Sequence, residues 1–213
     1  MTCRRYVLYG AIAAALLAGC ASIPETRFYT LSEASASPDA GNPGLPPSSG
    51  SIFIDVMTVS VPERLARPQL VVRTTGQAPQ LFILEQDRWS SHFNHELRDA
   101  FGAQITSKTG AINETRGSRA PGQPSYRIAI ELGQFDAVVG DSVRARFGWT
   151  ITRTTDGRNA ACYSVISEPV RGGIEGVVEG VRRSVSRVAA DISRNLVELD
   201  MGQVATCSPR SGR

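Results

Sequence analysis

Apolar and polar positions alternate in the second half of the chain in a way that predicts antiparallel strands. From Val143 to Ile151 every second side chain is apolar, and the side chains between them are mainly arginine and threonine. A period of two is typical of a strand with one buried and one exposed face. The preceding run SYRIAIELGQFDAVV predicts a neighbouring strand, and ACYSVIS, after a turn at TTDGRN, completes a hairpin.

Two other segments have the apolar spacing of an amphipathic helix. Between residues 88 and 107 a large apolar side chain recurs at every fourth position, namely Trp89, Phe93, Leu97, Phe101 and Ile105. Residues four positions apart share one face of a helix, so this stripe predicts a helix packed on a core. A longer series of valine, isoleucine and leucine predicts a second helix over residues 174–199.

Shorter extended segments are predicted in the first half, at residues 27–31, 51–61, 70–73 and in the run PQLFILEQ. Residues 112–124 are rich in glycine, arginine and proline and predict an exposed loop. Strands precede helices twice, which favours an α/β class: a single domain with a mixed β-sheet and helices packed on it. A length of 213 residues suits one domain with a substantial core.

The amino terminus predicts a targeting signal rather than part of this fold. Arg4 and Arg5 precede an apolar or small run from Tyr6 to Ala18, which is too short for a membrane-spanning helix of about 20 residues. The run ends in Leu17-Ala18-Gly19-Cys20, which resembles the bacterial lipobox. In signals of that kind the cysteine thiol is acylated and the peptide is cut before it. The alternative for Cys20 is an ordinary buried or disulfide-bonded cysteine.

This interpretation divides the chain into four parts. Residues 1–19 are the lipoprotein signal peptide, 20–26 the acylated anchor and short tether, 27–207 the domain, and 208–213 a disordered tail. Within the domain, residues 32–50 consist mainly of serine, proline, glycine and alanine and predict a flexible loop. Two or more acyl chains anchor a protein stably. Ala21 is not the aspartate that commonly retains bacterial lipoproteins at the inner membrane, so the periplasmic face of the outer membrane is favoured.

Two cysteines remain once Cys3 leaves with the signal peptide and Cys20 is acylated. The bacterial periplasm is oxidising, so we expect a disulfide between Cys162 and Cys207. The chain-entropy model assigns about 4 kcal/mol to a loop of this length. Two unpaired thiols are the alternative.

Charge and motifs argue against several classes of function. The chain carries 23 lysine and arginine residues against 20 acidic residues and has no basic run, so nucleic-acid binding lacks electrostatic support. His92, His95 and Glu96 lie within one predicted helical turn, but there is no third histidine to complete a metal site, and a solvated polar face is favoured. Phosphate-binding, dinucleotide-binding and nucleophile-elbow motifs are absent. We therefore expect no enzyme, no cofactor and no metal. The glycines at positions 176 and 180 are best explained by close packing on the sheet.

The order of motifs resembles one known family. The lipobox, the run RFYTL, the strand ending VPERLARPQLVVRT and an RW pair opening a helix are similar to the PqiC/YmbA family of ABC-type transport auxiliary lipoproteins. The resemblance extends from Phe28 to the last helix. Family members tend to follow the tryptophan with a Glu-Pro-Leu-like turn, where this chain has Ser90-Ser91-His92-Phe93.

The resemblance implies α/β/α layers and a role in an MCE-type ABC lipid transport system. Such a lipoprotein docks the periplasmic MCE protein, which works with a permease and an ATPase, to the outer membrane for intermembrane lipid transport. A ring of copies of the chain is compatible with this role. A lipid-binding or small-ligand-binding lipoprotein, or an assembly lipoprotein of another envelope machine, remains the alternative. Besides Cys20, the residues that match the family pattern, and so are candidates for partner binding, are Phe28, Tyr29, Arg64, Arg67, Pro68, Arg73 and Trp89. For Trp89 and Pro68, packing and turn formation are the competing explanations.

Overall fold

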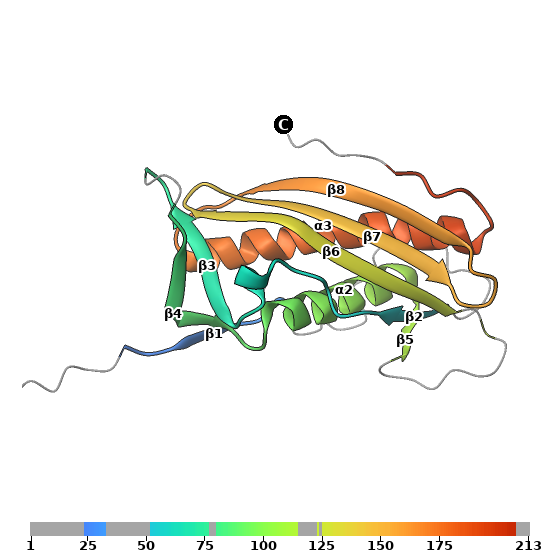
Figure 1. The fold of residues 1–213 in the computed structure, drawn as a ribbon, viewed down its shortest axis with the longest axis horizontal. Helices are drawn as coiled ribbons and strands as arrows, with labels where there is room; N and C mark the ends of the chain where they lie inside the picture. The colour runs from blue at the N-terminus through green and yellow to red at the C-terminus, as the bar shows by residue number, and fades with distance from the viewer. Residues whose placement is uncertain (1–23, 33–51, 77–79, 115–122, 124, 208–213) are drawn as a thin grey trace, which may run out of the picture.

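The computed structural model describes residues 24–32, 52–76, 80–114, 123 and 125–207. In these residues the chain forms one eight-stranded mixed sheet and two α-helices (Figure 1). The strands are β1 (Arg27–Tyr29), β2 (Phe53–Val56), β3 (Gln69–Thr74), β4 (Phe82–Trp89), β5 (Ile112–Asn113), β6 (Ser125–Val139), β7 (Ser142–Arg153) and β8 (Asn159–Pro169). The helices are α2 (Phe93–Thr109) and α3 (Ile174–Asp200), and a short 3-10 helix, η1, spans Glu63–Leu65. The signal peptide, Cys20, the loop from residue 33 and the tail 208–213 lie outside the described residues.

The long strand β6 organises the sheet, because it pairs with three other strands. Along one side it pairs antiparallel with β7, which in turn pairs antiparallel with β8. On its other side, the beginning of β6 pairs in parallel with β2 and its end pairs in parallel with β3. Two branches therefore leave the same side of β6: one ends in β5, and the other continues through β4 to the edge strand β1.

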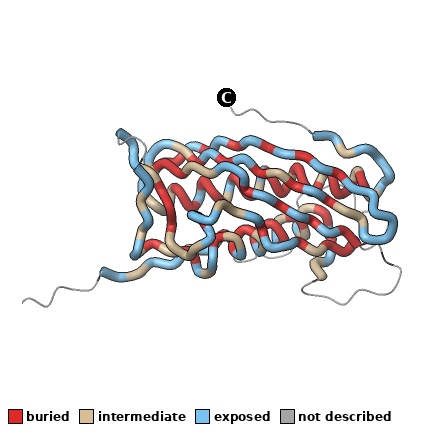
Figure 2. The backbone as a smooth tube through the Cα atoms, in the orientation of Figure 1, coloured by how far each residue is buried: buried red, intermediate tan, exposed pale blue. Residues whose placement is uncertain are grey.

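Alternating burial along β6, β7 and β8 places the core on one face of these strands. Every second residue of β8 is buried, and burial alternates in the same way along most of β7 (Figure 2). Phe147 and Trp149 of β7 face the helices. Phe147 contacts Phe101 of α2, with ring centroids 5.5 Å apart, and Trp149 Nε1 donates to Asn195 of α3 at 3.1 Å. Both helices thus cover the same face. The predicted α/β fold, a mixed sheet with helices packed on it, is confirmed; of the implied α/β/α layers, the described residues supply the sheet and one helix layer.

Helix α2 begins later than the sequence pattern predicts. Trp89 is the last residue of β4, and the helix starts at Phe93 after two serines and a histidine in extended conformation. The apolar stripe from Phe93 to Ile105 is buried as expected. A residue can therefore match the helical spacing and still belong to the strand before the helix, because both elements pack on the same core. Gly110, with a φ of 71°, ends the helix in the left-handed conformation that glycine adopts without a steric penalty.

The other predicted elements differ from the structure mainly in length. The predicted strand 51–61 contains β2 and a single further bridge at Ser60, because the chain leaves β6 after Val56 and rejoins it at Ser60. The predicted loop 112–124 begins with the two-residue strand β5. The predicted strands in the second half appear as β6, β7 and β8.

Two features fix α3 against its surroundings. A Cβ on Gly176 would lie 2.1 Å from the Arg171 carbonyl oxygen, and one on Gly180 would lie 3.0 Å from Val143 of β7, so both glycines serve close packing. Beyond the helix, Cys207 is bonded to Cys162 of β8, with Cα atoms 5.5 Å apart. The predicted disulfide therefore joins the segment after α3 to β8.

Candidate functional site

The end of the molecule formed by β1, β3 and β4, which we call the anchor end, receives the chain from the amino terminus (Figure 1). β1 adds to β4 in parallel, with Phe28 opposite Arg88 and Tyr29 opposite Trp89. The Tyr29 carbonyl accepts from the Ser90 N–H at 2.7 Å, which continues this pairing by one residue. The short segment after the predicted anchor is thus built into the sheet as its edge strand.

Asp87 of β4 holds β1 through side chains. Its Oδ1 atom lies 2.7 Å from the Arg27 guanidinium and accepts from the Tyr29 hydroxyl at 3.0 Å. Burial, followed by this hydrogen bond to a carboxylate, raises the pKa of Tyr29 to about 12. Asp87 is itself largely buried, so these two partners compensate a charge that has little contact with water.

Glu96 holds the end of the same segment. Its carboxylate accepts from the Thr30 hydroxyl and the Leu31 N–H, both at 2.9 Å, and from the hydroxyls of Ser90 at 2.6 Å and Ser91 at 3.0 Å. Burial alone would raise the pKa of Glu96, but these four hydrogen bonds outweigh it and hold the pKa below its ordinary value. A buried, ionised carboxylate therefore ties the chain after β1 to the first turn of α2.

This position of Glu96 corrects the expectation of a solvated polar face. His92 and His95 are exposed, with ring centroids 6.3 Å apart, but Glu96 is 5% exposed and points inward. The reason is that Glu96 and Ala100 lie beside the apolar stripe of α2, where the chain after β1 passes over the helix. Among the described residues, no three side chains suitable for a metal ion gather in one place.

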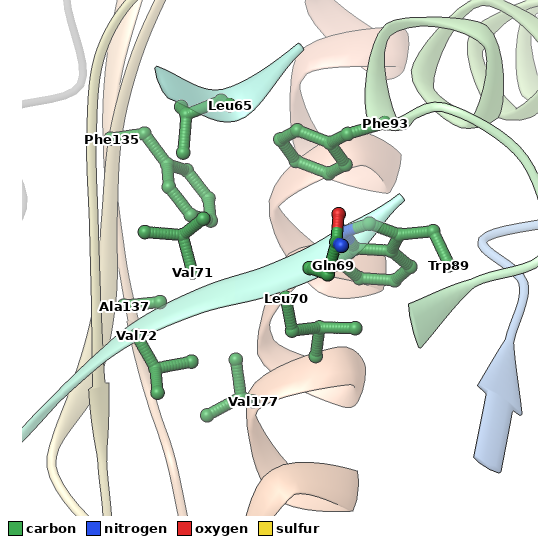
Figure 3. A pocket seen from close by; sticks show the side chains of 10 residues that line it. All are labelled: Leu65, Gln69, Leu70, Val71, Val72, Trp89, Phe93, Phe135, Ala137 and Val177. Carbon is green, nitrogen blue, oxygen red and sulfur yellow. The ribbon is translucent and has the colours of Figure 1, made fainter. Parts of the chain in front are cut away.

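An aromatic cluster lies under η1, where β3, β4 and α2 meet. Trp89 stacks on Phe93, with ring centroids 5.1 Å apart, and Phe93 contacts Phe135 of β6 at 5.5 Å. Figure 3 shows Phe93 and Phe135 pointing toward one another, with Leu65 on one side of them and Val177 of α3 on the other. The apolar cavity between these side chains has a volume of about 10 Å³. It is close to the minimum that a single water molecule requires.

Arg67 and Pro68 take part in this region through their backbone. The Arg67 carbonyl accepts from the Phe93 N–H at 3.3 Å, and the Pro68 carbonyl accepts from the Trp89 N–H at 2.7 Å. The turn at Arg67-Pro68 therefore closes over the beginning of α2 and the end of β4. This arrangement gives Pro68 and Trp89 a structural role.

The remaining arginines with a family match lie apart from one another. Arg73, near the end of β3, donates from Nε to Asp136 at 2.7 Å and pairs with it through a second nitrogen, while Arg144 reaches the same carboxylate at 3.1 Å. Arg64 lies exposed on η1. Two-nitrogen contacts of this kind fix the orientation of an arginine.

The structure thus brings together some of the predicted residues and separates others. Phe28, Tyr29, Trp89 and the turn at residues 67–68 gather where β1 meets the end of β4, whereas Arg73 lies at the far end of β3 and Arg64 lies on η1. Phe28 and Arg64 are the exposed members of the set. The sequence reasoning missed Asp87 and the role of Glu96. The sequence offered one signal for each residue. Asp87 is a carboxylate near the end of a strand, and Glu96 is a carboxylate beside the apolar stripe of a helix.

The family model described as "ABC-type transport auxiliary lipoprotein component" matches residues 29–193. No curated protein gives a match. No α-helix in the described ranges is long and apolar enough to cross a membrane.

Solved structures show the same fold at low sequence identity. A crystal structure of an uncharacterised protein superposes with a TM-score of 0.60 at 16% identity, covering 81% of this chain and 99% of the other. A protein of the DUF330 family from Xanthomonas campestris gives a TM-score of 0.56 at 14% identity, covering 76% of this chain and 92% of the other.

Proposed function

The chain belongs to the family of ABC-type transport auxiliary lipoprotein components, and on this premise we propose that it is a non-catalytic, lipid-anchored part of an MCE-type ABC lipid transport system. In this role acylated Cys20 holds the domain at the periplasmic face of the outer membrane. The domain binds the periplasmic MCE protein, which works together with the permease and the ATPase of the transporter. The family match over residues 29–193 carries the proposal.

The contacts of β1 support an anchoring role. Six residues separate Cys20 from Arg27, and six extended residues span at most about 20 Å. Asp87 holds β1 itself, and Glu96 holds the two residues that follow it. The domain therefore lies close to the membrane that holds the acyl chains, and force on the anchor is passed directly to β4 and α2.

The aromatic cluster itself is packed too tightly to enclose a lipid tail. Ligand pockets for small molecules have volumes of about 300–1,000 Å³. The apolar cavity between Trp89, Phe93 and Val177 has only about 10 Å³. An acyl chain does not fit into a cavity of this size.

The docking proposal can be tested with the acylated full-length protein extracted in mild detergent. We expect it to capture the MCE protein encoded in the same genome, and native mass spectrometry to find the domain free of stoichiometric phospholipid. Two results contradict docking and support the lipid-binding alternative. Either the MCE protein is absent from the captured proteins, or a phospholipid remains bound to the isolated chain.

Two variants separate anchor from docking. Cys20→Ala is expected to abolish membrane fractionation and to leave capture of the MCE protein intact, because Cys20 precedes residues 27–207, which we expect to form the domain. Arg64→Glu is expected to weaken capture without changing fractionation, because this exposed arginine on η1 matches the family pattern. Unchanged capture by Arg64→Glu excludes this arginine from the docking surface.

A further inference from the structure

The geometry points to a second membrane contact that is independent of the acyl chains. We assign it to three exposed apolar side chains of the anchor end: Phe28 on β1, Leu81 just before β4, and Ile83 within β4. The occupant of this surface is the lipid bilayer that holds Cys20. The inference rests on the proposed function, because it requires an acylated Cys20.

These side chains belong to the exposed large apolar residues of the described chain. Phe28 is 66% exposed, and Leu81 and Ile83 are each 46% exposed. They lie on two paired strands, with Phe28 opposite Arg88, seven residues after Leu81. At about 3.3 Å per residue, the three side chains spread over about 23 Å of one end of the molecule. Exposed apolar side chains gathered at one end mark a surface that meets a partner or a membrane.

The position of the anchor selects the membrane as that partner. The chain enters the described structure at residue 24, at the anchor end (Figure 1). The tether of about 20 Å cannot lengthen unless β1 leaves β4, and the contacts of Arg27 and Tyr29 with Asp87 oppose this. The short tether therefore keeps the anchor end next to the bilayer surface. The bilayer is the apolar partner that this end contacts at a high effective concentration.

The chemistry of the surface suits the interfacial region of a bilayer. Aromatic and aliphatic side chains enter the boundary between head groups and acyl chains, while arginines keep their charged ends among the head groups. Arg27 and Arg88 stand next to and opposite Phe28, and both are partly exposed. β1 pairs with β4 on one side only, and a shallow contact leaves the backbone groups on its free edge at the level of the head groups, where water remains available.

A contact of this kind orients the domain. The elongated molecule carries the anchor end at one extreme, and the β7–β8 turn and the end of α3 lie toward the other (Figure 1). With the anchor end on the bilayer, the opposite end points away from the membrane. It then becomes available to a periplasmic partner.

The test uses the acylated protein in vesicles of phosphatidylethanolamine and phosphatidylglycerol. Acylation of Cys20 and the Cys162–Cys207 disulfide leave no free thiol in the mature chain, so a single added cysteine can be labelled selectively. The variants are Phe28→Cys, Leu81→Cys and Ile83→Cys, each carrying a nitrobenzoxadiazole fluorophore. Val165→Cys on β8 is the matched control, since Val165 is 43% exposed on the outer face of the sheet.

We expect the emission of the three labels at the anchor end to shift to the blue on vesicle binding and to lose quenching by aqueous iodide. The label at Val165 is expected to keep both its emission and its quenching. If the protein floats with the vesicles while all four labels are quenched equally, the proposed second membrane contact is wrong, whereas the proposed acylation of Cys20 is supported. If the protein does not float, the acylated anchor itself is wrong, and this contact falls with it.

Discussion

The carboxylate of Glu96, in the first turn of α2, accepts a hydrogen bond of 2.9 Å from the backbone N–H of Leu31, which lies 65 positions earlier in the chain. The same oxygen accepts from the Thr30 hydroxyl. The segment that follows β1 is thereby held by the helix that packs on α3.

Replacement of Glu96 tests how much this contact stabilises the domain. Glu96→Ala removes the acceptor for four donors and leaves the buried Leu31 N–H without its partner, so we expect a loss of about 3 kcal/mol of unfolding free energy. Glu96→Gln should lose less, because its amide can still accept from Leu31 while the serine hydroxyls turn to accept from it. Urea unfolding of both variants measures the difference, and equal losses contradict this account.

The pH dependence of stability follows from the lowered pKa of Glu96. The unfolded chain binds a proton at this site at a higher pH than the folded chain does. The stabilisation is therefore fully present above the ordinary glutamate pKa of about 4.3 and is lost as the pH falls through the folded value. Unfolding curves from pH 6 to pH 3 should show a smaller decline for Glu96→Gln than for the natural chain. Equal declines in the stability of the two proteins would show that other carboxylates dominate the pH dependence.

The disulfide should stabilise the domain measurably. Cys162 and Cys207 are 45 positions apart, and closing a loop of this size is worth about 4 kcal/mol in the chain-entropy model. We expect Cys162→Ala/Cys207→Ala to lose about 2 to 4 kcal/mol, because Thr206 keeps its hydrogen bonds to Asn195 and Glu198. Thermal unfolding with and without reductant provides the measurement. The double variant should no longer respond to reductant.

The two glycines at the beginning of α3 should respond differently to alanine. A Cβ at position 176 meets the Arg171 carbonyl oxygen at 2.1 Å, which requires the backbone to shift, whereas at position 180 it meets side-chain methyls of two valines at 3.0 and 3.2 Å, which can give way by a few tenths of an ångström. Overpacking typically costs about 1–3 kcal/mol, and alanine regains about 1 kcal/mol of helix propensity. Gly176→Ala should therefore destabilise clearly more than Gly180→Ala in chemical unfolding. The reverse order would place the tight contact on the sheet.

Trp89 and Phe28 match the same family pattern but should behave differently when truncated. Trp89 is 4% exposed and stacks on Phe93, so Trp89→Ala is expected to lose about 3–5 kcal/mol. Phe28→Ala, at an exposed position, should stay within about 0.5 kcal/mol of the natural chain. Denaturant midpoints distinguish the two. A large loss for Phe28→Ala would mean that β1 depends on this side chain for its attachment.

The sequence anticipated elements best where one face is buried along a whole element. β6, β7, β8 and α3 follow their patterns closely, because alternation of period two or recurrence near 3.6 directly reflects one-sided burial. The apolar spacing placed the start of α2 five residues early, at residue 88 instead of Phe93, since Trp89 and Phe93 pack on the same core from different elements. Short elements such as β5 carry too few residues for a pattern.

By itself the sequence determined the α/β class and the family, because these depend on local periodicity and on the order of motifs along the chain. Only the tertiary structure decided that β1 pairs with β4, that Asp87 and Glu96 hold it, and that Arg73 meets Asp136. These relationships join residues about 60 positions apart. Local preferences cannot specify such pairs, because the free energy that selects them arises only when distant segments exclude water together.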